Sequence, residues 1–147
     1  MSIRHAACNC GQLHLTCEGE PLRISMCHCL ECQRRTGSVL SNQAWFQRQQ
    51  IIDIAGTSTR FVRASDSGHS VAFRFCPVCG STVYWEAERF ANWIAVAVGA
   101  FADPTFPAPT YSVFERRRHG WLEMTSHVPI EHSNSTAAII RFLKDPR

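Results

Sequence analysis

Two cysteine-rich stretches decide the fold: residues 27–32 read Cys-His-Cys-Leu-Glu-Cys, and residues 76–80 read Cys-Pro-Val-Cys-Gly. A shorter cluster, Cys-Asn-Cys-Gly, occupies residues 8–11. Thiols two or three positions apart do not pair easily with each other, because so short a loop strains disulfide geometry. They can converge on one metal ion, and thiolate sulfur favours zinc among the common divalent ions. We therefore predict a protein organised around zinc.

Length and composition set the class of protein. The chain has 147 residues, of which 45% are hydrophobic and 18% are charged, and its formal net charge is +3. These values predict one folded domain over residues 1–147 and exclude a wholly disordered chain. The mild charge argues against a nucleic-acid partner.

The sequence also bears on location. The longest apolar run, residues 93–102, is far below the roughly 20 residues that a bilayer requires, so no membrane association is expected. The first residues contain no apolar run of the kind found in secretory signals. We expect a cytoplasmic protein with reduced thiols.

The seven clustered thiols divide most economically into a set of four and a set of three. The four are Cys8, Cys10, Cys76 and Cys79, and the three are Cys27, Cys29 and Cys32. Four thiolates close the tetrahedral shell of a structural zinc ion, whereas three leave one position accessible to substrate or water. A division that joins the first pair to two thiols of the middle cluster satisfies the same counts. Spacing alone leaves both divisions open.

Several other residues are candidates for a role near these clusters. Cys17 is alone on a predicted strand, so we expect a small buried hydrophobe. His28 lies between two potential ligands, and its side chain is expected to point away from the ion. A helical turn over residues 33–35 would place Arg34 or Arg35 near the middle cluster, where either could hold a substrate carboxylate. The basic run at residues 116–119 is typical of a solvent-exposed edge. The alternative is a site that binds an anionic group such as a carboxylate or a phosphate.

The remaining sequence predicts a mainly β fold. Short runs rich in β-branched and aromatic residues alternate with polar turns, as half-buried strands do. The predicted strands are residues 12–17, 39–46, 51–54, 60–63, 70–75, 82–85 and 94–98. The proline-rich residues 103–109 predict an extended loop. A short C-terminal helix is expected over residues 137–143, ahead of Asp145-Pro146.

The combination of clusters resembles the glutathione-dependent formaldehyde-activating enzyme family, which also includes the centromere protein V domain. The resemblance rests on Cys-x-Cys-Gly at residues 8–11, Cys-His-Cys-x-x-Cys followed by Thr36-Gly37, and Phe-Cys-x-x-Cys-Gly at residues 75–80. It implies an Mss4-like fold of several coiled antiparallel sheets around zinc. It also implies two zinc ions per chain, a structural one on the set of four and a catalytic one on the set of three.

The resemblance implies a function as well. Members of the family condense a thiol such as glutathione with formaldehyde or another small aldehyde, as S-(hydroxymethyl)glutathione synthase does, which makes them carbon–sulfur lyases. On this reading Cys27, Cys29 and Cys32 form the catalytic centre. The alternative is a non-catalytic binding module in which both zinc ions are architectural. A zinc-dependent hydrolase is a weaker third option, because no Glu or His base is evident beside the middle cluster.

Overall fold

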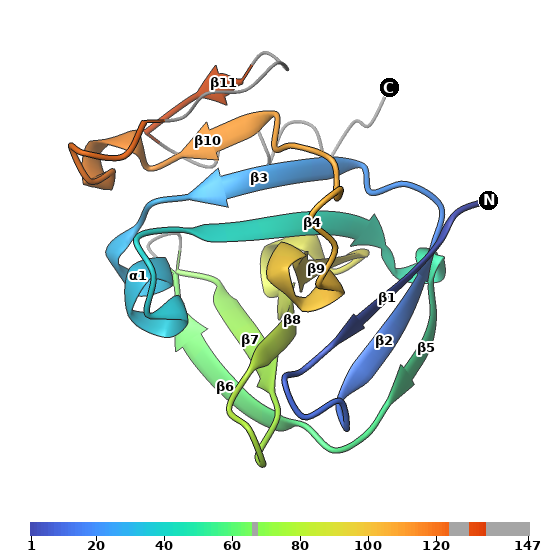
Figure 1. Ribbon diagram of the computed structural model, residues 1–147. Helices are drawn as coiled ribbons and strands as arrows, with labels where there is room; N and C mark the ends of the chain where they lie inside the picture. Colours follow the sequence, from blue (N-terminus) through green and yellow to red (C-terminus); the bar gives the residue numbers. More distant parts are fainter. Residues whose placement is uncertain (66–67, 124–129, 135–147) are drawn as a thin grey trace. The chain divides into compact units, whose positions relative to one another are not determined.

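The computed structural model describes residues 1–65, 68–123 and 130–134 (Figure 1). These residues form eleven strands in two sheets and one α-helix, which confirms the prediction of a mainly β protein. The helix predicted at residues 137–143 lies outside the described residues. The chain forms two compact units, the first made of Met1–Leu22 and Ala44–Pro104, the second of Arg23–Gln43 and the described part of Thr105–Arg147.

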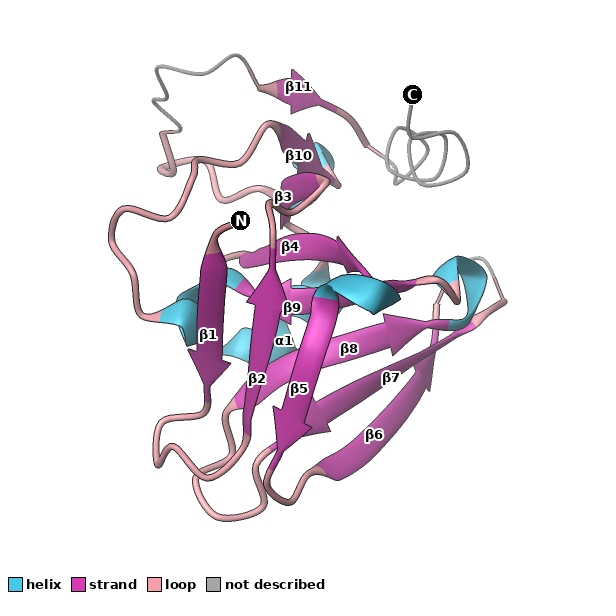
Figure 2. Ribbon diagram, turned by 90° about the vertical axis from the view of Figure 1, so that its right-hand side faces the viewer, coloured by secondary structure: helices cyan, strands magenta, loops and turns pink. Residues whose placement is uncertain are grey.

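The first unit contains a three-stranded antiparallel sheet, in the order β1 (Ile3–Ala7), β2 (His14–Glu18) and β5 (Ile51–Ala55) (Figure 2). Alternation along β2 buries Leu15 and Cys17 completely and leaves their neighbours partly exposed. Leu15 lies opposite Ala6 of β1, which is also fully buried. The expectation that Cys17 is a buried hydrophobe is therefore confirmed, and its burial raises the pKa of its thiol to about 12.

The first unit also contains four consecutive antiparallel strands. They are β6 (Thr59–Ala64), β7 (Ser70–Phe75), β8 (Thr82–Ala87) and β9 (Trp93–Ala97). The apolar centres of β8 and β9 supply most of the core of this part, including Val83, Trp85, Ile94 and Val96. The turn from β7 into β8 contains residues 76–81, so the Cys-Pro-Val-Cys-Gly stretch closes a hairpin. Short 3-10 turns follow three strands: Arg48–Gln50 after the strand at residues 41–47, Glu88–Phe90 after β8, and Val98–Phe101 after β9.

The second unit is built on parallel strand pairs. Strand β10 (Tyr111–Val113) lies between β3 (Arg23–Cys27) and β11 (Glu131–His132) and is parallel to both. All five residues of β3 are buried, and the Arg23 guanidinium lies 3.2 Å from the centre of the Tyr111 ring. Helix α1 (Leu30–Thr36) follows β3, and a 3-10 turn at Glu115–Arg117 follows β10. Because Cys27 pairs with Val113, the start of α1 and the turn after β10 lie at the same end of these strands.

Strand β4 (Ser41–Gln47) begins in the second unit and ends in the first. It agrees to within two residues with the strand predicted at 39–46, and the other predicted strands agree as closely. Strands β1, β3, β10 and β11 were not predicted from the sequence. The proline-rich residues 103–109 contain no helix or strand, as expected. The helical turn predicted at residues 33–35 is the middle of α1.

Candidate metal centres

Four cysteines of the first unit form one cluster. Cys8 and Cys10 lie in the turn between β1 and β2, and Cys76 and Cys79 lie in the turn between β7 and β8. Their four Sγ atoms all lie within 4.8 Å of one another, and the Cys10 Sγ is 3.6 Å from those of both Cys8 and Cys76. Four sulfurs around a tetrahedral zinc ion are about 3.8 Å apart, given Zn–S bonds of about 2.3 Å. The four-cysteine cluster therefore fits a metal ion of this kind. The structure brings together the predicted set of four rather than the mixed set.

The two turns direct backbone N–H groups at the sulfurs. The Leu13 amide donates to the Cys8 Sγ and the Val78 amide donates to the Cys76 Sγ, both at 3.3 Å. Gly80 has a φ of +78°, in the left-handed region, and its amide closes the second turn by donating to the Cys76 carbonyl. Hydrogen bonds from the hydroxyl and backbone of Ser81 lower the pKa of the Cys79 thiol to about 5. Donors placed in this way stabilise thiolates, which are the form that binds metal.

Gln12 supports the four-cysteine cluster from outside. Its Nε2 donates to the Cys76 Sγ at 2.9 Å and to the Thr57 carbonyl at 2.7 Å, and its Oε1 accepts from the Thr57 amide at 2.8 Å. The Gln12 backbone lies against Gly56, where an added Cβ would be 1.8 Å from the Gln12 carbonyl oxygen. Gln12 thus ties a metal-ligand candidate to the end of β5. Its role was not predicted, because its partners are distant in the sequence.

Three cysteines of the second unit form the other cluster. Cys27 ends β3, Cys29 caps the start of α1, and Cys32 lies in the first turn of that helix. Their Sγ atoms lie within 4.8 Å of one another, and no other described His, Cys, Asp or Glu belongs to this group. Hydrogen bonding to the other two thiols and burial raise the pKa of the Cys27 thiol above its usual range. Three thiolates satisfy three of the four positions that zinc prefers.

The helix begins on one of these sulfurs. The Cys29 Sγ accepts a hydrogen bond from the Cys32 amide at 3.3 Å, in the position that a Ser or Asp side chain usually takes at a helix start. The helix ends at Gly37, whose φ of +66° allows its amide to donate to the Gln33 carbonyl. None of the eight cysteines is in a disulfide, so the sulfurs of both clusters are available to metal.

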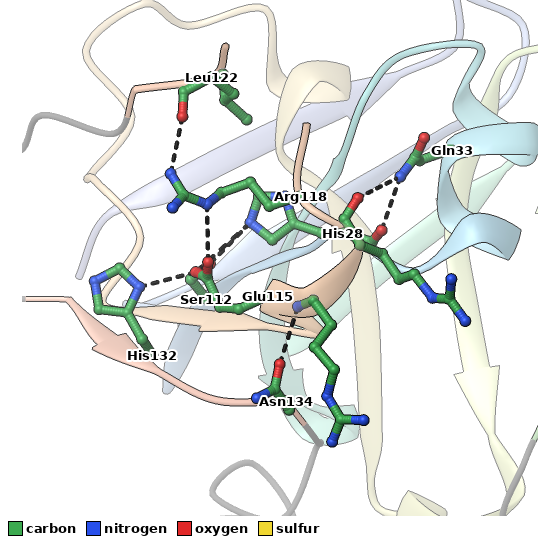
Figure 3. A network of polar contacts seen from close by, with 10 residues as sticks. His28, Gln33, Ser112, Glu115, Arg118, Leu122, His132 and Asn134 are labelled. Carbon is green, nitrogen blue, oxygen red and sulfur yellow. Dashed lines mark hydrogen bonds and ion pairs between the residues drawn. The ribbon is translucent and has the colours of Figure 1, made fainter. Parts of the chain in front are cut away.

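His28 is fully buried but does not belong to the three-cysteine cluster. Its Nε2 lies 2.8 Å from the Ser112 Oγ, and the Ser112 hydroxyl in turn donates to Glu115 Oε1 (Figure 3). The expectation that this side chain points away from the ion stays a prediction, which the contact with Ser112 supports. Burial lowers the pKa of His28, which favours the neutral imidazole.

Glu115 is the centre of this network. Its Oε1 also accepts from His132 Nδ1 at 2.8 Å, and its Oε2 lies 3.0 Å from Arg118 Nε. Burial opposes ionisation of the carboxyl, but the hydrogen bonds from Ser112 and His132 outweigh it and hold the pKa below the usual value. Sequence reasoning found neither Ser112 nor Glu115, because the contact between His28 and Ser112 spans 84 residues.

Gln33 joins helix α1 to the basic run at residues 116–119. Its Nε2 donates to the carbonyls of His28 and Arg117, and its Oε1 is 2.8 Å from His119 Nε2. The basic run therefore lies beside the helix that contains Cys32. Within the run, Arg118 is paired with Glu115, whereas the Arg116 and Arg117 side chains are exposed.

The two helix arginines proposed from the sequence differ in environment. The Arg35 guanidinium donates to the Ser41 hydroxyl at 2.7 Å in a partly buried polar cluster. Arg34 is exposed and lies 3.5 Å from Glu31 on the helix surface. Such a surface pair is weak, so Arg34 remains available to an anionic ligand.

The geometry defines a mainly β protein with one closed and one open cysteine cluster. Comparison with protein-family models matches residues 3–117 to the glutathione-dependent formaldehyde-activating enzyme family. The chain belongs to this family. A search of curated proteins gave no match.

The fold also occurs in solved structures. A crystal structure of a Rhodobacter sphaeroides protein, determined as a structural genomics target, matches with a TM-score of 0.52 and 17% sequence identity. The match covers 70% of this chain and 90% of the other. At this identity the likeness concerns the fold alone. In the described part of the chain, no helix has the length and hydropathy to cross a membrane.

Proposed function

We propose that the protein is an enzyme that condenses a thiol such as glutathione with formaldehyde or another small aldehyde, and is thus a carbon–sulfur lyase acting in the synthetic direction. The thiol sulfur forms a bond to the aldehyde carbon, the carbon–oxygen double bond becomes single, and the thiol proton ends on the oxygen. The main support is the three-cysteine cluster, which no other described metal-binding side chain completes. Membership of the family supports the choice of substrates.

The proposal includes two zinc ions per chain. Cys8, Cys10, Cys76 and Cys79 would hold a structural ion, and Cys27, Cys29 and Cys32 would hold a catalytic one. At the second position, zinc would supply a Lewis acid that favours the thiolate form of a substrate thiol and polarises a carbonyl. Because three thiolates outweigh the two positive charges of the ion, thiol activation is the better motivated of these effects.

The chain's own residues would bind and orient the substrate. Arg34, Arg116 and Arg117 are exposed on the second unit, and Gln33 holds their two segments together. Guanidinium groups suit carboxylates, which glutathione has at both ends. Cys27 and Cys32 are buried, so their sulfurs are shielded from water and from oxidants. We expect replacement of these arginines to raise KM for an acidic thiol more than for a neutral one.

We also propose that the two units act as one domain, because the family match includes parts of both. Eight cysteines outside any disulfide favour a reducing compartment, so we assign the protein to the cytoplasm.

The test is catalysis by the zinc-loaded chain. Exchange between formaldehyde hydrate and S-(hydroxymethyl)glutathione can be followed by NMR with ¹³C-formaldehyde, with and without protein. We expect the exchange to accelerate with the natural chain and with Cys17→Ala, which changes a buried thiol outside both clusters, but not with Cys29→Ser. A chain that holds two zinc ions and leaves the spontaneous rate unchanged would refute the activity and favour the binding module.

A further inference from the structure

The hydrogen bonds around Ser112 fix which nitrogen of His28 has the proton. A serine hydroxyl has one hydrogen, and that of Ser112 is donated to Glu115 Oε1. In the 2.8 Å contact between Ser112 Oγ and His28 Nε2, the imidazole must therefore be the donor. His28 Nδ1 is buried and has no hydrogen-bond partner among the described residues. The imidazole is thus held by Nε2 alone.

The anchor of this network lies on a paired strand and the turn after it. Ser112 lies on β10, which pairs with β3, and the His28 amide donates to the Val113 carbonyl at 3.1 Å. Glu115 is itself held by Arg118 and His132. Backbone and side chain of His28 are therefore both tied to β10 and the turn that follows it.

The position of His28 in the chain makes this restraint chemically important. Imidazole nitrogen is a common zinc ligand, and three cysteines with one histidine form a standard closed zinc site. His28 lies between Cys27 and Cys29, so it is the nearest histidine in sequence to the three-cysteine cluster. Nevertheless its nitrogens are outside that cluster. A histidine that closed the shell would exclude a substrate thiol.

We propose that Ser112 and Glu115 are positioning residues that hold the His28 imidazole away from the three-cysteine cluster and so reserve the fourth metal position for substrate. This inference rests on the proposed function. It assigns the network a role in keeping the site open, whereas a purely structural network would affect folding alone.

The first test reads the state of His28 directly. Imidazole ¹⁵N spectra of the zinc-loaded protein distinguish a protonated nitrogen, a free nitrogen and a metal-bound nitrogen. We expect a protonated Nε2 and no metal-bound nitrogen for His28 in the natural chain. In Ser112→Ala and in Glu115→Gln, a metal-bound nitrogen should appear, and it should disappear when His28→Asn is added. Ser41→Ala removes another buried hydroxyl of the second unit outside the network and should leave the spectrum unchanged.

The second test measures access to the fourth position. With Co²⁺ in place of zinc, the visible difference spectrum on adding 2-mercaptoethanol reports thiol binding at the open cluster. If the released imidazole occupies the position nine-tenths of the time, thiol affinity falls about tenfold. We expect this loss in Ser112→Ala and Glu115→Gln, and recovery of the natural affinity when His28→Asn is added to either variant.

The outcomes separate this inference from the proposed function. A metal-bound His28 in the natural chain, or unchanged ¹⁵N spectra in both folded network variants, overturns the inference whatever the activity. Absence of any thiol response in the natural Co²⁺ protein, with His28 unbound to metal, contradicts the proposed function while the ¹⁵N comparison still decides the role of the network.

Discussion

Replacement of Cys79 by serine should unfold the first unit. The four-cysteine cluster joins two turns, and its Cys10 and Cys76 are 66 residues apart. A cross-link over a loop of that length stabilises a fold by about 4 kcal/mol through chain entropy alone. Structural zinc sites contribute about 10–16 kcal/mol of apparent binding free energy, which matches or exceeds the roughly 5–15 kcal/mol stability of a typical domain.

The assay combines metal analysis with urea unfolding monitored by circular dichroism. Cys79→Ser should give insoluble protein, or soluble protein without a cooperative transition. The matched control is Cys17→Ala, a buried thiol of the same unit that no cluster uses, for which we expect a loss of about 1 kcal/mol. A Cys79→Ser chain that unfolds cooperatively, with a loss of unfolding free energy no larger than that of the control, would refute the role of the cluster as a structural cross-link.

Three further predictions concern the second cluster, a glycine and a carboxylate. Cys29→Ser should lower the zinc content from two ions to one and leave the fold intact, so an unfolded circular-dichroism spectrum would contradict it. Gly56→Ala should lower the unfolding free energy in urea by about 4 kcal/mol, because φ is +92° and the new Cβ would meet the Gln12 carbonyl, whereas Gly99→Ala, with open space around it, should change it by less than about 1 kcal/mol. The lowered pKa of Glu115 means that its ionised form stabilises the fold above the usual Glu pKa of about 4.3, and that this contribution is lost as the pH falls below that value. The difference in unfolding free energy between the natural chain and Glu115→Gln should therefore shrink between pH 6 and pH 3, and a constant difference would argue against an ionised Glu115.

Strand prediction succeeded where local pattern is sufficient. Residues 51–54 and 70–75 are rich in branched and aromatic side chains, and both lie in strands. Strand β3 was missed because it buries Arg23 and Ser25, which are usually exposed. Arg23 is accommodated by the Tyr111 ring, a partner from a distant part of the chain. Because Arg23 is buried through a partner 88 residues away, the sequence around it shows no alternation of apolar and polar residues that would predict a strand.

The two sulfur sets could be predicted from the spacing together with the family resemblance, but their surroundings could not. The structure groups all seven expected cysteines into the two expected sets. The contacts around them join ordinary polar residues across the sequence: Gln12 donates to Cys76, 64 residues away, and Ser112 contacts His28 across 84 residues. Within the basic run at residues 116–119, Arg118 pairs with Glu115, a contact that the sequence did not predict. Such roles depend on strand pairing and register, which a single sequence does not specify.

Helix α1 is too short to persist by itself, since isolated helices below about 12 residues are marginal in water. Its first turn is secured by the Cys29 sulfur, and its flank by Gln33. The same sulfur atom is therefore both a candidate metal ligand and the cap of the helix. If the three-cysteine cluster binds a metal ion, binding would change the order of the first turn of the helix. Gln33 would transmit that change to Arg117, in the segment proposed to bind an acidic substrate.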